Sequence, residues 1–284
     1  MSNHNILWSL RVPKEFFSSL LGGWVTVTSD IIKLLFTRPV ERGLQTGCEM
    51  RLFCFPYAGG SCSIFRNWGL GLPKSIEIFP VELPGRGTRY HEAPYTELPL
   101  LVKQIARELV PFLDKPFALF GHSMGAIISF EVARRLRADQ FNASLLIVSG
   151  RGAPHLPQTR EPMHSLPDRE FLSGLSNLNG TAREVLNNPE LMGVLLPLLR
   201  ADFRMIETYT YLAAQPLDCP ILMFGGFDDR STGREELKAW RQHTTRQSWL
   251  HMFPGDHFFL TEAAQSLVLD RLSRSLRNLV SHHR

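Results

Sequence analysis

The sequence predicts an α/β fold in which a mostly parallel central sheet is flanked by helices and carries an inserted helical lid. Short, continuous apolar runs alternate along the chain with longer segments whose apolar residues recur at helical spacing. Runs that are apolar at every position are typical of parallel strands covered by helices on both faces. One segment, residues 155–214, has helical patterns only and separates two expected strands.

The expected elements follow one another from about residue 48 to the end of the chain. Pro56 ends the first strand, and the turn LPGRG at 83–87 ends the second. Strands are predicted over 50–55, 76–81, 117–120, 145–149, 221–224 and 249–253, and helices over 98–113, 125–138 and 264–279.

The inserted segment predicts a capped helix at 165–175 and a longer helix at 189–212 that bends at Pro197. We expect it to form a lid over the carboxyl edge of the sheet. Extra helical packing without a gating role is the alternative.

Residues 1–47 are expected to form an extension that is poorly ordered or loosely docked. Its apolar stretch, 15–36, is interrupted by glycines and by Asp30 and Lys33, which excludes a spanning helix. It also lacks the compact apolar core and cleavage site of a signal peptide. A docking or membrane-surface role is the alternative.

Charge and cysteine usage narrow the class of protein. The 284 residues carry a net charge of +4 without a run of five or six like charges, so no nucleic-acid tail is expected. The cysteines form no CxxC pair, which indicates free thiols in a reducing compartment and predicts a cytoplasmic protein without a cysteine-based metal site. A monomer is expected. The cysteines are Cys48, Cys54, Cys62 and Cys219.

The stretch FALFGHSMGAIISF, residues 117–130, joins an expected strand to an expected helix through a G-x-S-x-G pattern. A sharp turn of this kind crowds the backbone around Ser123, and Gly121 and Gly125 relieve the crowding. The Ser123 hydroxyl is then exposed, and the N–H of Met124 points toward the same space at a helix N-terminus. The pattern predicts a nucleophile elbow, with a glycine-rich turn around an incidental serine as the alternative.

A serine nucleophile needs a base, and the base needs an orienting carboxylate. His257, in FPGDHFFL after the last strand, is the candidate base, because that loop would lie at the same sheet edge as the elbow. ILMFGGFDDR at 221–230 offers Asp228 and Asp229 as the carboxylate, and spacing does not separate them. Other histidines are interpreted as packing residues (His122, His251), surface or lid residues (His91, His155, His164, His243) or tail residues (His282, His283).

Acyl transfer also requires donors for the negative oxygen that develops in the transition state. Met124 is expected to supply one backbone N–H. The loop PYAGGS at 56–61, which follows the first strand, is expected to supply the second from Ala58.

Longer motifs make a resemblance specific. They are LFCFPYAGGS (52–61), LPGRGTR (83–89), PFALFGHSMGA (116–126), LRADF (199–203), ETYTY (207–211), CPILMFGGFDD (219–229) and FPGDHFFL (253–260). With them the chain resembles the type II thioesterases that accompany polyketide and nonribosomal peptide synthases. The resemblance runs from about residue 51 to the last helix and does not reach residues 1 to about 45.

The resemblance implies an α/β-hydrolase fold with a helical lid. It also implies in-trans editing, in which acyl or aminoacyl thioesters are hydrolysed from the phosphopantetheine arm of acyl or peptidyl carrier domains. It places the triad on Ser123, Asp229 and His257, and the oxyanion donors on Ala58 and Met124. The substrate carries the phosphopantetheine, so neither a cofactor nor a metal is expected.

The sequence departs from the family's usual glycine at Asn179 and Asp256. Arg86, Arg89 and Arg151 are candidates to meet an acidic carrier, with an ordinary charged surface as the alternative. A serine carboxylesterase acting on small oxygen esters and a catalytically silent carrier-binding module are the competing functions.

Overall fold

The computed structural model describes residues 47–158, 160–178, 188–261 and 264–282, so nearly all of the expected N-terminal extension lies outside the described residues. All six predicted strands are present, within a few residues of the expected bounds. They are β1 (Met50–Phe55), β2 (Ile76–Pro80), β3 (Phe117–His122), β4 (Leu145–Ser149), β5 (Ile221–Gly226) and β6 (Ser248–Phe253).

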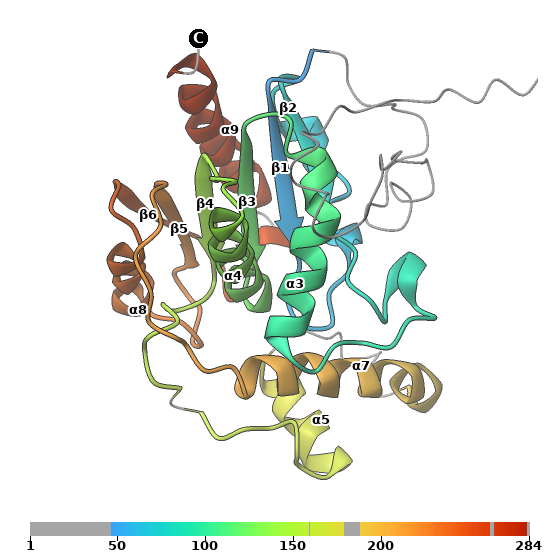
Figure 1. Ribbon diagram of the computed structural model, residues 1–284. Helices are drawn as coiled ribbons and strands as arrows, with labels where there is room; N and C mark the ends of the chain where they lie inside the picture. Colours follow the sequence, from blue (N-terminus) through green and yellow to red (C-terminus); the bar gives the residue numbers. More distant parts are fainter. Residues whose placement is uncertain (1–46, 159, 179–187, 262–263, 283–284) are drawn as a thin grey trace, which may run out of the picture.

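The six strands form one sheet in the order β2-β1-β3-β4-β5-β6, and every neighbouring pair is parallel. The predicted α/β fold is therefore confirmed, with a wholly parallel sheet among the described residues. Because all strands run the same way, their carboxyl ends meet at one edge, where ligand sites of such sheets form. In Figure 1 this is the lower edge, at the head of the β1 arrow.

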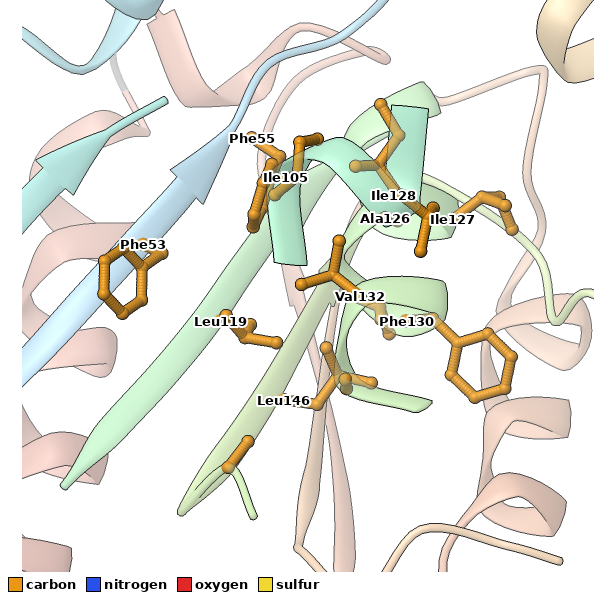
Figure 2. Packing of buried hydrophobic residues seen from close by; sticks show 14 of the residues in the cluster. Phe53, Phe55, Ile105, Leu119, Ala126, Ile127, Ile128, Phe130, Val132 and Leu146 are labelled. Atoms are coloured by element: carbon orange, nitrogen blue, oxygen red, sulfur yellow. The ribbon is translucent and has the colours of Figure 1, made fainter. Parts of the chain in front are cut away.

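Helices cover both faces of the sheet, as the doubly apolar strands require. Phe53 and Phe55 of β1 belong to the core cluster that includes α3 and α4, whereas Leu52 and Cys54 belong to the cluster that includes α9. Figure 2 shows the first cluster, with Phe53, Leu119 and Leu146 of three neighbouring strands beside side chains of α3 and α4. The helices are α2 (Trp68–Gly71), α3 (Leu98–Leu109), α4 (Met124–Ala138), α8 (Arg234–Lys238) and α9 (Gln265–His282).

The inserted segment contains two helices, α5 (Asp168–Asn177) and α7 (Pro189–Glu207), and no strand in its described residues. They lie below the carboxyl edge of the sheet (Figure 1) and share a small apolar core of their own. Phe171 of α5 and Phe203 of α7 meet edge to face, with ring centroids 5.5 Å apart. Whether this lid gates the site stays a prediction.

The longer lid helix ends earlier than expected. It runs through Pro197 but stops at Glu207, so the predicted extent to residue 212 is wrong. The side chain of Thr208 donates a hydrogen bond to the Arg204 carbonyl oxygen over 2.7 Å, and residues 208–211 alternate threonine and tyrosine, which have low helix propensity. The Tyr209 hydroxyl, which donates to Glu131 over 2.7 Å, ties this segment to α4 instead.

The four cysteines are buried, and none forms a disulfide, as expected. The thiols of Cys48 and Cys62 donate hydrogen bonds to the carboxylates of Glu77 and Glu82 over 3.3 and 3.0 Å. Across the described residues, no helix combines the length and the apolar character needed to cross a lipid bilayer.

Candidate active site

Ser123 occupies the corner between β3 and α4 in a strained conformation. Its φ is +55°, a value that residues other than glycine rarely adopt, and such strain clusters at functional sites. A Cβ at Gly121 would lie 1.9 Å from the carbonyl oxygen of Gly125, and a Cβ at Gly125 would lie 2.2 Å from that of Phe55. Both flanking glycines are therefore required by close backbone approach, as the G-x-S-x-G pattern predicts.

The loops after β5 and β6 bring Asp229 and His257 together. Nδ1 of His257 lies 2.8 Å from Oδ2 of Asp229, whose side chain is fully buried. Asp228 is exposed, and its side chain makes no hydrogen bond within the described ranges. The structure thus separates the two aspartates that spacing left open, and it places Asp229 against the histidine.

Ser231 completes the surroundings of the carboxylate, and the sequence analysis missed it. Its backbone N–H and its hydroxyl donate to Oδ1 of Asp229 over 2.7 and 2.6 Å, and the hydroxyl lies 2.9 Å from Nδ1 of His257. Burial acts to raise the pKa of Asp229, but the hydrogen bonds from His257 and Ser231 outweigh it and lower that pKa below its usual range. The available signal was the position of Ser231, two residues after an aspartate, where an Asx turn forms.

An ionised Asp229 fixes the tautomer of His257. Because the carboxylate only accepts hydrogen bonds, the Nδ1–H of the imidazole points at it, and Nε2 is left with its lone pair free. That arrangement is the one that a general base needs.

His122, next to the serine, is a packing residue whose ring contacts that of His257. It is fully buried, its Nδ1 is 2.9 Å from the Ser149 hydroxyl, and its ring centroid is 5.1 Å from that of His257. Burial, and then the nearby positive charge of His257, lowers the pKa of His122 to about 3. His122 therefore stays neutral beside His257 near pH 7.

Two backbone donors face the same space as the serine. Met124 is the first residue of α4, so its N–H has no partner within the helix. Ala58 lies in the loop after β1, and both residues line the same cavity as Ser123. Neither N–H donates a hydrogen bond to another described residue, so both are available to an oxyanion.

The cavity that joins these groups has a volume of about 520 Å³. Ser123 and His257 lie on its sheet side, and lid residues, among them Leu199 and Phe203, form an apolar wall opposite. A concave site with an apolar wall and a few convergent polar groups suits a small acyl substrate. Ser123 and His257 line the same cavity. Within the described ranges, the Ser123 hydroxyl makes no hydrogen bond, either to His257 or to any other residue.

The arginines considered for carrier binding are not on an open surface. Arg86 and Arg89 are both 6% exposed; Arg86 pairs with Asp202, and Arg89 donates to Glu92 over 2.6 Å. Both surface interpretations of these two residues are therefore wrong, because each guanidinium is buried and paired with a carboxylate of this chain. Arg151 lies in the wall of the cavity.

His243, interpreted as a surface or lid residue, is buried, so that interpretation is wrong. It packs against the ring of Phe130, with centroids 5.1 Å apart, and its Nε2 lies 2.7 Å from Nδ1 of His155. A neutral imidazole can fill an aromatic core position, and sequence alone does not reveal that environment.

The two departures from the family pattern have different outcomes. Asp256 accepts a hydrogen bond from the backbone N–H of Phe258 over 2.8 Å, so it shapes the turn that carries the histidine. Asn179 lies outside the described residues.

Comparison with known proteins adds the family. A family model described as a thioesterase domain matches residues 50–276. The gramicidin S biosynthesis protein GrsT of Aneurinibacillus migulanus is 44% identical over 230 residues, which cover 81% of this chain and 90% of that protein.

Two solved structures extend the match. The RedJ thioesterase of the prodiginine pathway of Streptomyces coelicolor superposes with a TM-score of 0.75 at 36% identity, covering 84% of this chain and 91% of that one. The type II thioesterase YbtT of the yersiniabactin NRPS/PKS pathway does so with a TM-score of 0.75 at 34% identity, covering 84% and 97%.

Proposed function

Since the chain belongs to the thioesterase family, we propose that it hydrolyses acyl and aminoacyl thioesters through a covalent intermediate on Ser123. The observation that carries the proposal is the pairing of His257 with Asp229 at one cavity with the strained serine. Thioester hydrolysis needs a nucleophile, a base and an oxyanion site, and each has a candidate here.

In the first half of the reaction, Nε2 of His257 takes the proton of Ser123 as the hydroxyl oxygen attacks the thioester carbonyl. The carbonyl oxygen becomes negative, and the N–H groups of Ala58 and Met124 stabilise it. Asp229 stabilises the imidazolium that forms. The carbon–sulfur bond then breaks, the leaving thiolate takes the proton from His257, and the acyl group remains on the serine.

In the second half, a water molecule attacks the acyl-serine while His257 takes one of its protons. The same two N–H groups bind the second oxyanion. Collapse releases the carboxylic acid and returns the proton to Ser123, so the groups of the chain itself account for every proton transfer.

We propose a carrier domain of a polyketide or nonribosomal peptide synthase as the partner, with the substrate on its phosphopantetheine arm and the enzyme acting in trans as an editor. In support, RedJ and YbtT are described as thioesterases of a prodiginine and a yersiniabactin NRPS/PKS pathway. The four buried cysteines form no disulfide, which suits a reducing compartment and supports a cytoplasmic location as part of the proposal. The mechanism calls on no resident cofactor.

The test is acyl release by the purified protein from an acetyl-loaded carrier, beside acetyl-CoA and a simple oxygen ester of acetate. We expect faster release from the carrier than from the oxygen ester, and loss of release in Ser123→Ala. A serine-reactive phosphonate should label the wild type and not this variant. Turnover of the oxygen ester alone would identify a carboxylesterase, and the absence of both labelling and turnover would leave a carrier-binding role.

A further inference from the structure

Asp202, in the lid helix α7, is a buried acid that the proposed reaction does not use. It is 1% exposed and forms a two-pronged ion pair with Arg86, whose Nη2 donates to Oδ1 over 2.7 Å and whose Nη1 donates to Oδ2 over 2.9 Å. Buried ion pairs contribute little net stability, because well-packed apolar residues of similar volume often serve as well. The pair is therefore better explained by what it holds in place.

The pair reaches the loop that carries Ala58. Oδ2 of Asp202 accepts a hydrogen bond from the backbone N–H of Gly59 over 2.7 Å. Nη1 of Arg86 donates to the carbonyl oxygen of Gly60 over 3.0 Å. The buried pair thus holds both a backbone N–H and a backbone carbonyl oxygen of the loop. Asp202 is 143 residues from Gly59 in the sequence.

The contact also selects a turn conformation. The N–H of Gly60 donates to the carbonyl oxygen of Tyr57 over 2.9 Å, and Gly59 has a φ of +75°, the value of the third residue of a type II turn. Type I and type II turns differ by a flip of the central peptide, here the one between Ala58 and Gly59. A flip would set a carbonyl oxygen against the Asp202 carboxylate, where two acceptors repel each other, so the carboxylate holds the type II form.

The lid helix lies directly on this turn. A Cβ at Gly59 would come within 2.5 Å of Cδ2 of Leu199, which is also in α7 and lines the cavity. The helix α7 therefore contacts the loop twice, through the apolar side chain of Leu199 and through the carboxylate of Asp202.

We propose that Asp202 is a positioning residue for the oxyanion hole. Together with Arg86 it fixes the turn so that the N–H of Ala58 points at the oxygen that becomes negative. The inference rests on the proposed function, because it takes Ala58 as an oxyanion donor. Because Asp202 is part of α7, turnover then requires that α7 be packed against the loop of Ala58.

The test replaces both members of the pair, because removing one leaves an unpaired buried charge that destabilises the fold. The double variant Arg86→Met/Asp202→Leu keeps the interior apolar and releases the Gly59 N–H. Arg86→Lys is a milder second variant that keeps a cation but loses the planar fork. Asp168→Asn is the control, since it breaks the exposed ion pair of Asp168 with Arg200 inside the lid and touches no part of the loop.

Two rates are compared: acylation, from single turnover of the acetyl-loaded carrier, and deacylation, from decay of the isolated acetyl-enzyme. Each passes through an oxyanion, and loss of one donor typically lowers such a rate about 10²–10³-fold. We expect both rates of the double variant to fall by the same factor, at least about tenfold, with KM changed less than about threefold. Arg86→Lys should lower both in equal but smaller proportion, and Asp168→Asn neither.

A folded double variant in which both rates stay near wild type would overturn the inference. A loss confined to acylation and KM would also overturn it, because it would assign the pair to carrier access. If the wild type hydrolyses only the oxygen ester, the thioester function fails, yet the same two rates measured with that ester still decide the role of Asp202.

Discussion

Replacing Asp229 by asparagine is expected to abolish turnover by trapping His257 in the wrong tautomer. Oδ1 of Asp229 accepts two hydrogen bonds from Ser231, one of them from a backbone N–H that cannot turn away. An asparagine must direct its carbonyl oxygen to that N–H, so its NH₂ group faces Nδ1 of His257. Nδ1 must then accept, Nε2 carries the proton, and the imidazole cannot take the proton of Ser123.

The size of the effect follows from the cost of the alternative orientation. An amide flipped the other way would restore the correct tautomer, and the Ser231 hydroxyl could turn to accept from its NH₂ group, but the Ser231 N–H would lose its acceptor. Such an unpaired donor costs about 1–3 kcal/mol. At about 1.4 kcal/mol per tenfold, the active tautomer becomes about 5-fold to 10²-fold rarer. The lost charge opposite the imidazolium adds to this, and in serine triads the same exchange lowers kcat about 10⁴-fold.

The assay is acetyl release from the loaded carrier, with thermal unfolding as a check on folding. Asp228→Asn is the matched control, because it makes the same chemical change on an exposed neighbour and should stay within about twofold of wild type. A ¹⁵N spectrum of the His257 ring should show the proton on Nε2 in Asp229→Asn and on Nδ1 in the wild type.

Two results would refute the reasoning. One is an Asp229→Asn enzyme within tenfold of wild type while its ring carries the proton on Nε2. The other is a large loss in Asp228→Asn with little loss in Asp229→Asn, which would move the carboxylate of the triad to Asp228.

Three further outcomes are expected. Ser231→Ala removes the hydroxyl donor to the triad carboxylate but keeps the backbone one, so kcat should fall about two- to tenfold with KM unchanged; a wild-type kcat would show that the hydroxyl is dispensable. Gly125→Ala sets a Cβ against a carbonyl oxygen of β1 and should lower the free energy of unfolding by about 2–3 kcal/mol. Gly193→Ala is the control, because a Cβ there would have no atom within 4 Å. Equal stabilities of the two variants in denaturant would contradict this. Burial lowers the pKa of His122 to about 3 and of His243 to about 4, whereas histidines of the unfolded chain titrate near 6.5. The unfolded state therefore binds more protons below about pH 6.5, by at most about two from these histidines. The free energy of unfolding should accordingly fall as the pH drops from about 6.5 toward 4. His243→Phe should reduce the number of protons taken up on unfolding by about one, and so make the fall in stability with pH less steep. An unchanged pH dependence would count against a neutral, buried His243.

The sequence predicted the parts of this molecule that local patterns encode. The strands are runs of apolar residues, and part of the elbow is local, because Gly121 avoids a clash with the carbonyl oxygen of Gly125, four residues further along the chain. Because all strands are parallel, loops that follow strands meet at one edge of the sheet, so the position of His257 after the last strand predicts that it lies near Ser123.

Interactions between distant segments could not be predicted in this way. Arg86 lies in a polar, glycine-rich turn, where charged residues are mostly exposed, and its partner Asp202 is 116 residues away. The choice of Asp229 over Asp228 depends on how a loop turns after β5, where the N–H of Asp228 donates to the carbonyl oxygen of Gly255. Neither the partner nor the turn has a local signature.

The same distinction between local and distant contacts bears on the proposed role of the lid helix in holding the loop of Ala58. The loops that bear the triad are tied to one another by backbone hydrogen bonds across the edge of the sheet: Ser123 donates to Ser149, Gly150 to Phe224, and Phe227 to Phe253.

The turn at residues 57–60 has one backbone hydrogen bond, which lies within the turn itself. Asp202 and Arg86 give the turn hydrogen bonds to distant segments. The ring of Tyr57 also packs edge to face on His122 and Phe258. On the proposed roles, backbone hydrogen bonds at the sheet edge join the loops of the nucleophile, the base and the carboxylate. The loop of Ala58 instead forms hydrogen bonds with Arg86 and with a helix inserted between β4 and β5. A substitution that unseats α7 should for that reason weaken oxyanion binding before it disturbs the triad.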